Sequence, residues 1–193
     1  MTTNNDQHLI TKILEGDTNA FAVLVDRYKD LVFTLALRML KNREEAEEVS
    51  QDTFIKTYKS LNKFKGDSKF STWIYKIAYN TSLDRIKKHK RSHQTVTIDE
   101  FTEHQVKTLD NALDQMEQQE RKQAIQDCLQ LLPSEDSFLL TLFYFEELSL
   151  DEISKAVGLT ANNVKVKLFR SRKKLTSILK ERLEPEMINY YEA

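Results

Sequence analysis

The stretch LDEISKAVGLTANNVKVKLFRSRKK, residues 150–174, constrains the fold more than any other part of the sequence. Ile153 and Val157 share one face with the leading leucine, so they predict a short helix with an apolar side. Gly158 follows, where a left-handed turn costs little, and Thr160 can cap a second helix. Two short helices joined by a tight glycine turn predict a helix-turn-helix. The inner stripe of the second helix is expected at Val164, Leu168, Ser171 and Leu175.

The second of these helices is strongly basic. Six cations and no acid lie between Thr160 and Leu175. An ordinary helical hairpin with a solvated basic face is the alternative, but such a face normally mixes the two signs of charge. The charge therefore favours binding to DNA.

The outward side chains of this helix are suited to reading base edges. Asparagine pairs well with adenine, arginine and lysine pair with guanine, and apolar groups contact the thymine methyl. The basic run from Arg172 to Lys174 lies further along and is expected to hold phosphates. The predicted duplex-binding residues are Asn163, Lys165, Val166, Lys167, Phe169, Arg170 and Lys173.

Charged residues elsewhere in the chain are grouped by sign, although the net charge is small. The net charge is -1, yet residues 85–91 are basic and residues 99–120 are acidic. Basic patches on a nearly neutral chain predict local docking on a polyanion rather than general adhesion to it.

The spacing of apolar residues predicts an all-α fold. The chain has three glycines and two prolines, and it lacks strand-like alternation of any length. Helical spacing covers most of the chain, with Asp17 and Asn42 expected at helix starts and Pro133 at a helix end. We expect two small helical domains, 1–94 and 113–193, joined by a flexible acidic linker, 95–112, with the helix-turn-helix in the second domain.

The first domain offers a second basic site, on the expected helix 70–91 and the glycine loop before it. Tyrosines, an amide and lysines share one face there, alongside an inner stripe. Rings stack on unpaired bases, amides read base edges and lysines hold phosphates, so this face suits a melted strand. A core position is the favoured alternative for Trp73 taken alone. The predicted residues are Lys65, Trp73, Lys76, Tyr79, Asn80, Lys87 and Lys88.

Several classes of function are disfavoured. Cys128 is the only cysteine, so an intramolecular disulfide and a cysteine-rich zinc site are excluded. The four histidines lack metal-ligand spacing, and neither a phosphate-binding glycine loop nor a nucleophile elbow occurs. We therefore expect no metal, no cofactor, no small-molecule substrate and no enzymatic activity. The N-terminus lacks a signal-peptide pattern and no segment approaches a membrane span, so the chain is expected to be soluble and cytoplasmic.

Two runs together carry a family resemblance. The run EEVSQDTFIKTYKSLNKFKGDSKFSTWIYKIAYNTSLDRI, followed by LPSEDSFLLTLFYFEELSLDEISKAVGLTANNVKVKLFRSRKKL, resembles the extracytoplasmic-function (ECF) group of sigma factors of bacterial RNA polymerase. The resemblance covers nearly the whole chain. It implies a protein that binds core RNA polymerase, directs it to the -35 and -10 elements of promoter DNA and promotes DNA opening. It also implies regulation by an anti-sigma factor, often a membrane-bound one.

The resemblance assigns roles to individual residues. The loop and helix over 65–80 match the part that captures a flipped base of the -10 element, and Asn80 matches a position that contacts the non-template strand. The recognition helix departs from the family pattern at residues 162–164, Asn-Asn-Val in place of Gly-Thr-Val, and at Val166, where serine is common. Positions facing the -35 element correspond to Lys165, Val166, Phe169 and Arg170. The residues implied to dock on the coiled coil of the polymerase clamp are Glu48, Gln51, Asp52 and Lys56, for which an ordinary solvated helix is the alternative.

A stand-alone helix-turn-helix regulator is the main alternative function. Such a protein binds duplex DNA tightly by itself, usually as a dimer. The sequence lacks a long heptad seam or second apolar face with which to build that dimer.

Overall fold

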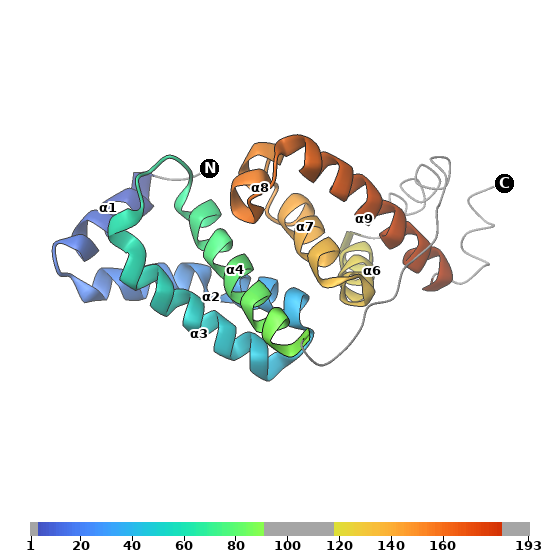
Figure 1. The fold of residues 1–193 in the computed structure, drawn as a ribbon, viewed down its shortest axis with the longest axis horizontal. Coiled ribbons are helices and arrows are strands. Elements are labelled where there is room, and N and C mark those ends of the chain that lie inside the picture. Colours follow the sequence, from blue (N-terminus) through green and yellow to red (C-terminus); the bar gives the residue numbers. More distant parts are fainter. Residues whose placement is uncertain (1–3, 91–117, 183–193) are drawn as a thin grey trace.

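The computed structural model describes residues 4–90 and 118–182, and within these ranges the chain is helical and contains no strand. Figure 1 shows the helices as two groups, α1–α4 and α6–α9, placed side by side. The all-α prediction is confirmed. The predicted linker, 95–112, and the tail after Pro185 lie outside the described residues.

The first group contains four α-helices and one short 3-10 helix, and its helix starts follow the capping residues of the sequence. Asp17 accepts hydrogen bonds from the backbone N–H groups of Asn19 and Ala20, and Asn42 accepts one from that of Glu45, as predicted for these starts. The elements are α1 (Asn4–Leu14), α2 (Thr18–Leu40), α3 (Arg43–Ser60), η1 (Leu61–Lys63) and α4 (Phe70–Lys90).

Helix α4 packs against both α2 and α3. Their shared core includes Leu24, Val32 and Ile74, each at most 1% exposed. Burial of such side chains stabilises by roughly 1.5–3 kcal/mol each. This packing holds α3 and α4 in a fixed orientation, so each can present an exposed face.

The second group contains the helix-turn-helix, and the prediction for it is confirmed. Gly158 adopts a left-handed conformation with φ 71°, and the Thr160 hydroxyl accepts a hydrogen bond from the Asn163 N–H at 3.2 Å. Ser149 and Glu152 form a reciprocal capping box at the start of α8. The elements are α6 (Gln118–Leu131), α7 (Ser134–Tyr144), α8 (Leu150–Val157) and α9 (Ala161–Arg182). The inner stripe of α9, which is Val164, Leu168, Ser171 and Leu175, is buried as predicted.

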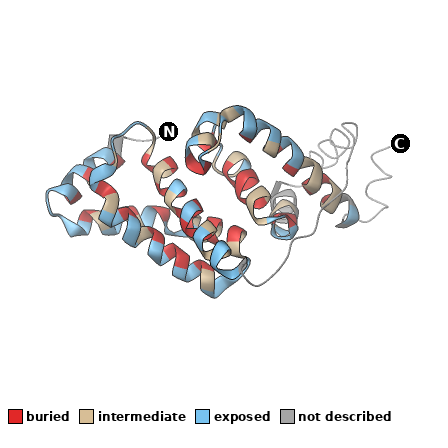
Figure 2. Cartoon of the chain, in the orientation of Figure 1, coloured by how far each residue is buried: buried red, intermediate tan, exposed pale blue. Residues whose placement is uncertain are grey.

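The two groups pack directly against each other. Helix α4 contacts α8, and α2 contacts α7. One apolar cluster runs from Ile74 of α4 to Phe138 of α7 and on to Ile153 of α8. Figure 2 shows that α4 and α7 both carry buried positions in this part of the molecule. The sequence predicted two domains but not this contact between them.

The contact corrects one prediction about α4. Tyr75 and Tyr79 were expected on an exposed face, but they are 2% and 7% exposed. The Tyr79 ring packs on Phe138 with centroids 5.0 Å apart, and the Tyr75 hydroxyl donates to Glu146 at 3.2 Å. Burial, reinforced by Glu135, raises the pKa of Tyr79 to about 12. The expectation failed because α4 is covered by α7 and α8 as well as by α2 and α3.

Candidate nucleic-acid interface

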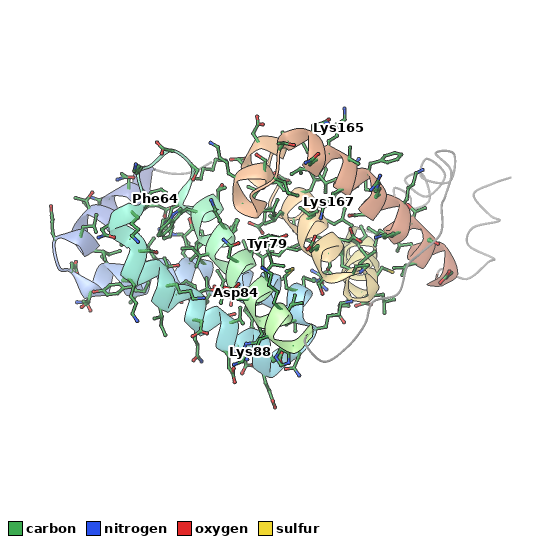
Figure 3. The ribbon with its side chains drawn as sticks, viewed as in Figure 1. Phe64, Tyr79, Asp84, Lys88, Lys165 and Lys167 are labelled. Atoms are coloured by element: carbon green, nitrogen blue, oxygen red, sulfur yellow. The ribbon has the colours of Figure 1, made fainter. Side chains whose placement is uncertain are left out.

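The outer side of α9 forms what we call the recognition face: Asn163, Lys165, Val166, Phe169 and Arg170. All five side chains are exposed. The buried inner stripe fixes the rotation of α9, because residues three and four apart share one side of a helix. Figure 3 shows Lys165 at the outer edge of the molecule. The five predicted residues are therefore brought together and face away from the core.

Two apolar side chains belong to this face. Val166 is 42% exposed and Phe169 is 44% exposed. Lys173 extends over the Phe169 ring, with its Nζ 4.7 Å from the centroid. A cation held against a ring in this way gains about 0.5–1 kcal/mol at an exposed site. The face therefore combines groups for base methyls with cations for phosphates or guanine.

Two acidic residues at the start of α7 bind side chains of α9 on the flank that faces α7. This role was not predicted from the sequence. Lys167 Nζ lies 2.6 Å from Glu135, and Lys174 Nζ lies 2.6 Å from Asp136. The Ser171 hydroxyl also donates to Asp136 at 2.6 Å. Lys167, predicted as a DNA contact, is thus half-buried and already paired within the protein. The sequence does show acids at the start of α7 and lysines on α9, and these opposite charges could have suggested the pairs. It does not show that the two helices are in contact.

Arg172 lies against α7, whereas the sequence predicts a phosphate contact for it. Its guanidinium sits 4.8 Å above the Phe143 ring and 5.4 Å from the Tyr144 ring. Stacking on two rings of α7 gives Arg172 a packing role. Fewer side chains of α9 then remain for the predicted phosphate contacts.

The exposed side of α4 forms a second surface, which we call the α4 face: Trp73, Lys76, Asn80 and Lys87. The spacing of three, four and seven residues places them along one side of the helix. Lys76, Asn80 and Lys87 are exposed, whereas Trp73 is half-buried. Two further predicted residues, Lys65 in the loop and Lys88 near the end of α4, are also exposed.

The tryptophan is held by an aromatic cluster at the start of α4. The Trp73 ring lies 5.3 Å from Phe64 and 5.8 Å from Phe70, measured between centroids. Tilted rings at this separation attract each other beyond their burial. Trp73 therefore packs against the aromatic side chains at both ends of the loop 64–70 while part of its ring stays accessible. A contact of Trp73 with an opened strand stays a prediction.

Tyr79 lies apart from the other predicted residues of this surface. Figure 3 shows it on the side of α4 that faces α7. In this arrangement Tyr79 cannot reach an unpaired base.

The predicted polymerase-docking residues share the outer side of α3, which we call the α3 face: Glu48, Gln51, Asp52 and Lys56. All four are exposed. Glu48 pairs with Arg85 of α4 at 2.8 Å. The Lys56 ammonium donates to Thr81 at 3.2 Å.

One apolar side chain extends this face. Ile55 is 51% exposed beside those polar groups, and the sequence analysis did not single it out. A single exposed isoleucine is common on a protein surface, so Ile55 by itself does not identify a contact surface.

Within residues 4–90 and 118–182, no helix combines the length and apolarity required to cross a bilayer. The same residues contain no cluster of three or more histidine, cysteine or carboxylate side chains arranged for a metal ion.

Comparison with known proteins agrees with this geometry. Residues 24–92 match the family model for Sigma-70 region 2, and residues 122–175 match that for Sigma-70, region 4. The first match covers α3 and α4, and the second covers the helix-turn-helix.

Related chains cover the same span. The ECF RNA polymerase sigma factor SigW of Bacillus subtilis is 34% identical over 178 residues, which are 89% of this chain and 95% of SigW. The RNA polymerase sigma-H factor of Pseudomonas aeruginosa is 32% identical, over 93% of this chain and 96% of that protein. Among solved structures, the sigma factor RpoE in complex with the anti-sigma factor NepR from Bartonella quintana has a TM-score of 0.61 at 17% identity, over 83% of this chain and 96% of that one. The chain therefore belongs to the ECF family of RNA polymerase sigma factors.

Proposed function

We propose that this sigma factor recognises promoters through the recognition face of α9 and the α4 face, each acting on a different DNA element. The proposed functional units are residues 1–94 for core polymerase and the -10 element, and 113–193 for the -35 element. Residues 95–112 join them.

The recognition face is proposed to enter the major groove of the -35 element. The observation that carries this assignment is the joint exposure of Lys165, Val166, Phe169 and Arg170 on the second helix of a helix-turn-helix. Arg170 and Asn163 supply hydrogen bonds to base edges, and Val166 supplies an apolar contact for a thymine methyl. Lys173 is proposed to reach a phosphate from the end of this face, whereas Lys167 contributes mainly through its pair with Glu135.

The α4 face is proposed to hold the opened strand of the -10 element. Lys76 and Lys87 offer phosphate contacts on either side of Asn80, and the accessible part of Trp73 offers a stacking surface. Each stacked base contributes roughly 1–3 kcal/mol, which offsets part of the cost of opening the duplex. Lys65 and Lys88 extend the basic surface at its two ends. Tyr79 joins it only if α7 moves away.

The α3 face is proposed to bind the coiled coil of the polymerase clamp, with Ile55 as its apolar centre. Acidic and amide groups around an exposed apolar side chain favour a basic partner surface. In this scheme the chain acts in the cytoplasm and carries out no catalysis itself, because the polymerase makes the RNA.

An anti-sigma factor is proposed as a further partner, anchored in the membrane or free. Support comes from the structural neighbour RpoE, which was solved with the anti-sigma factor NepR. Affinity purification of the tagged chain from its native cell, across several growth states, tests this proposal. Recovery of polymerase without an inhibitor in every state would count against it.

Run-off transcription tests the main proposal most broadly. The purified chain and core polymerase are supplied with a pool of genomic fragments, and the RNA products are sequenced. We expect a small set of start sites that share two upstream motifs. Arg170→Ala should change the upstream motif and Asn80→Ala should reduce yield from all promoters. Lys12→Ala, which changes an exposed cation of α1 that belongs to neither surface, should do neither. Specific duplex binding by the chain alone, with no effect of polymerase, would favour a stand-alone regulator instead.

A further inference from the structure

The basic charge of α9 is only partly available to DNA, because several of its cations are bound to α7. The sequence places six cations between Thr160 and Leu175. Lys167 and Lys174 are paired with acids of α7, each at 2.6 Å, and Arg172 stacks on two rings of that helix. Half of the positive charge in this segment is therefore bound within the protein.

The two lysine pairs lie on the same flank of α9 as the residues proposed to read base edges. Lys167 is four residues after Asn163 and three before Arg170, so successive turns bring these side chains into one row. Lys174 continues the row one turn beyond Arg170. The carboxylates that bind the lysines consequently lie beside the base-reading groups.

The pairs remain accessible to solvent and therefore to a phosphate. The side chains of Lys167 and Glu135 are 41% and 45% exposed, and the Lys174 side chain is 35% exposed. A phosphate that approaches this flank meets a lysine whose charge is already neutralised by its partner. The two acids thus withdraw cations from phosphate binding and add negative charge that repels the DNA backbone.

Phosphate contacts and base contacts respond differently to such acids. Phosphate contacts supply nearly all of the affinity for DNA of arbitrary sequence, whereas base edges supply the sequence preference. Asn163 and Arg170 stay exposed on the recognition face. Acids that neutralise their neighbours therefore lower the affinity for every sequence, and a larger share of the remaining affinity depends on the bases.

We propose that Glu135 and Asp136 restrict sequence-independent DNA binding by α9, because they compete with phosphates for Lys167 and Lys174. In this scheme the recognition face binds a duplex weakly unless the bases match its reading groups. The inference rests on the proposed function of α9, since it concerns DNA that is bound at this helix.

Salt-dependent binding of the full-length chain to a labelled duplex of random sequence tests this inference. Fluorescence anisotropy is measured between about 50 and 200 mM salt, a range over which phosphate contacts weaken strongly. Glu135→Gln removes one negative charge and retains an oxygen that can accept from Lys167. We expect tighter binding at low salt and a salt dependence that is steeper by roughly one counterion for this variant. The double variant Glu135→Gln/Asp136→Asn should gain about two counterions, with an affinity ratio between the two salt concentrations that grows roughly 3.5-fold per lysine.

Asp26→Asn is the matched control. Asp26 pairs with Lys29 on α2, so this substitution breaks a lysine pair and changes the net charge by the same amount without touching α9. It should leave the salt dependence unchanged. An effect as large as that of Glu135→Gln would show that only net charge matters and would overturn the proposal. Lys167→Ala added to Glu135→Gln should cancel the increase, because the lysine that was released is then absent.

A structural role of the two acids alone predicts the opposite sign, since a loosened α9 would bind DNA more weakly. Unchanged or weaker binding by variants that circular dichroism shows to be folded would therefore overturn the inference. Failure of the proposed function looks different: Arg170→Ala would leave the -35 preference of the holoenzyme unaltered. If Arg170→Ala does change that preference while the acid variants keep the parent salt dependence, the inference alone is wrong.

Discussion

Tyr79 of α4 and Phe138 of α7 pack ring against ring, with centroids 5.0 Å apart, where the two helical groups meet. The two residues come from different sigma-factor regions, since residues 24–92 match region 2 and residues 122–175 match region 4. A surface proposed to hold an opened DNA strand is thus continuous with a surface that binds another part of the same chain. Under the proposed function, residues that stabilise the fold and residues that bind the opened strand therefore lie on adjacent sides of α4.

The first prediction concerns this contact. Phe138→Ala should reduce the free energy of unfolding by about 3–5 kcal/mol, since it leaves a cavity at a fully buried site. Urea unfolding followed by circular dichroism measures the change. Phe169→Ala is the matched control and should alter stability by less than about 0.5 kcal/mol, because that ring is 44% exposed. Equal losses in the two variants would show that Phe138 is not a core residue.

The second prediction concerns the acid that holds α9. Asp136→Ala should destabilise by about 1–3 kcal/mol, because Lys174 loses its half-buried carboxylate partner and Ser171 keeps only the Lys167 carbonyl as an acceptor. Asp136→Asn retains an acceptor for Ser171 and should lose less. Thermal unfolding of the full chain ranks the two variants. An alanine variant as stable as the parent would mean that these contacts do not orient α9.

The third prediction concerns pH. The hydrogen bond from Lys69 lowers the pKa of Glu152 from its ordinary 4.5 to about 2. Because the folded-state pKa lies below the ordinary value, this interaction stabilises the chain fully above about pH 4.5 and is lost as the pH falls toward 2. Glu152→Gln, which preserves the capping box, should therefore lose roughly 0.2–1 kcal/mol at pH 7 and little at pH 2.

Glu146 provides the opposite case for the same pH series. Burial raises its pKa, so its ionised form costs free energy in the folded chain. Glu146→Gln should consequently not destabilise at pH 7, because the amide oxygen can still accept from Tyr75. Unfolding midpoints across pH 2–7 distinguish the two glutamates. Identical pH profiles for the two variants would refute both assignments.

The fourth prediction separates base reading from phosphate contact on α9. Arg170→Ala should cost about 1–3 kcal/mol at its preferred base pair and relax the sequence preference there. Lys173→Ala should weaken binding to all promoters alike and reduce the salt dependence by about one counterion. Binding of the holoenzyme to a library of -35 variants, at several salt concentrations, measures both effects. A sequence change caused by Lys173→Ala would reverse the roles.

The sequence predicted what depends on neighbours within one helix. Asp17, Asn42 and Gly158 mark helix ends through local backbone chemistry, so the elements that they bound were correctly placed. The inner stripe of α9 follows from helical period alone, which is why the exposure of its outer side was also predictable.

The features that the sequence did not predict depend on contacts between segments far apart in the chain. The burial of Tyr79 requires Phe138, and the pairing of Lys167 requires Glu135 on another helix. Hydrophobic period identifies the side of α4 that meets α2 and α3 but does not reveal a second covered side. Tyrosines and lysines suit both a nucleic acid and a protein neighbour, so residue type alone could not decide between them.

The most direct test is a paired footprint on one promoter from the run-off pool, with DNase protection reporting the -35 element and permanganate reactivity reporting opened thymines near -10. We predict that the chain with core polymerase yields both signals and that the chain alone yields neither. Arg170→Ala should reduce the -35 protection, and the combined change Lys76→Ala/Asn80→Ala should reduce the permanganate signal. The account is contradicted if the Lys76→Ala/Asn80→Ala variant keeps the full permanganate signal. It is also contradicted if the Arg170→Ala variant keeps the full protection at -35.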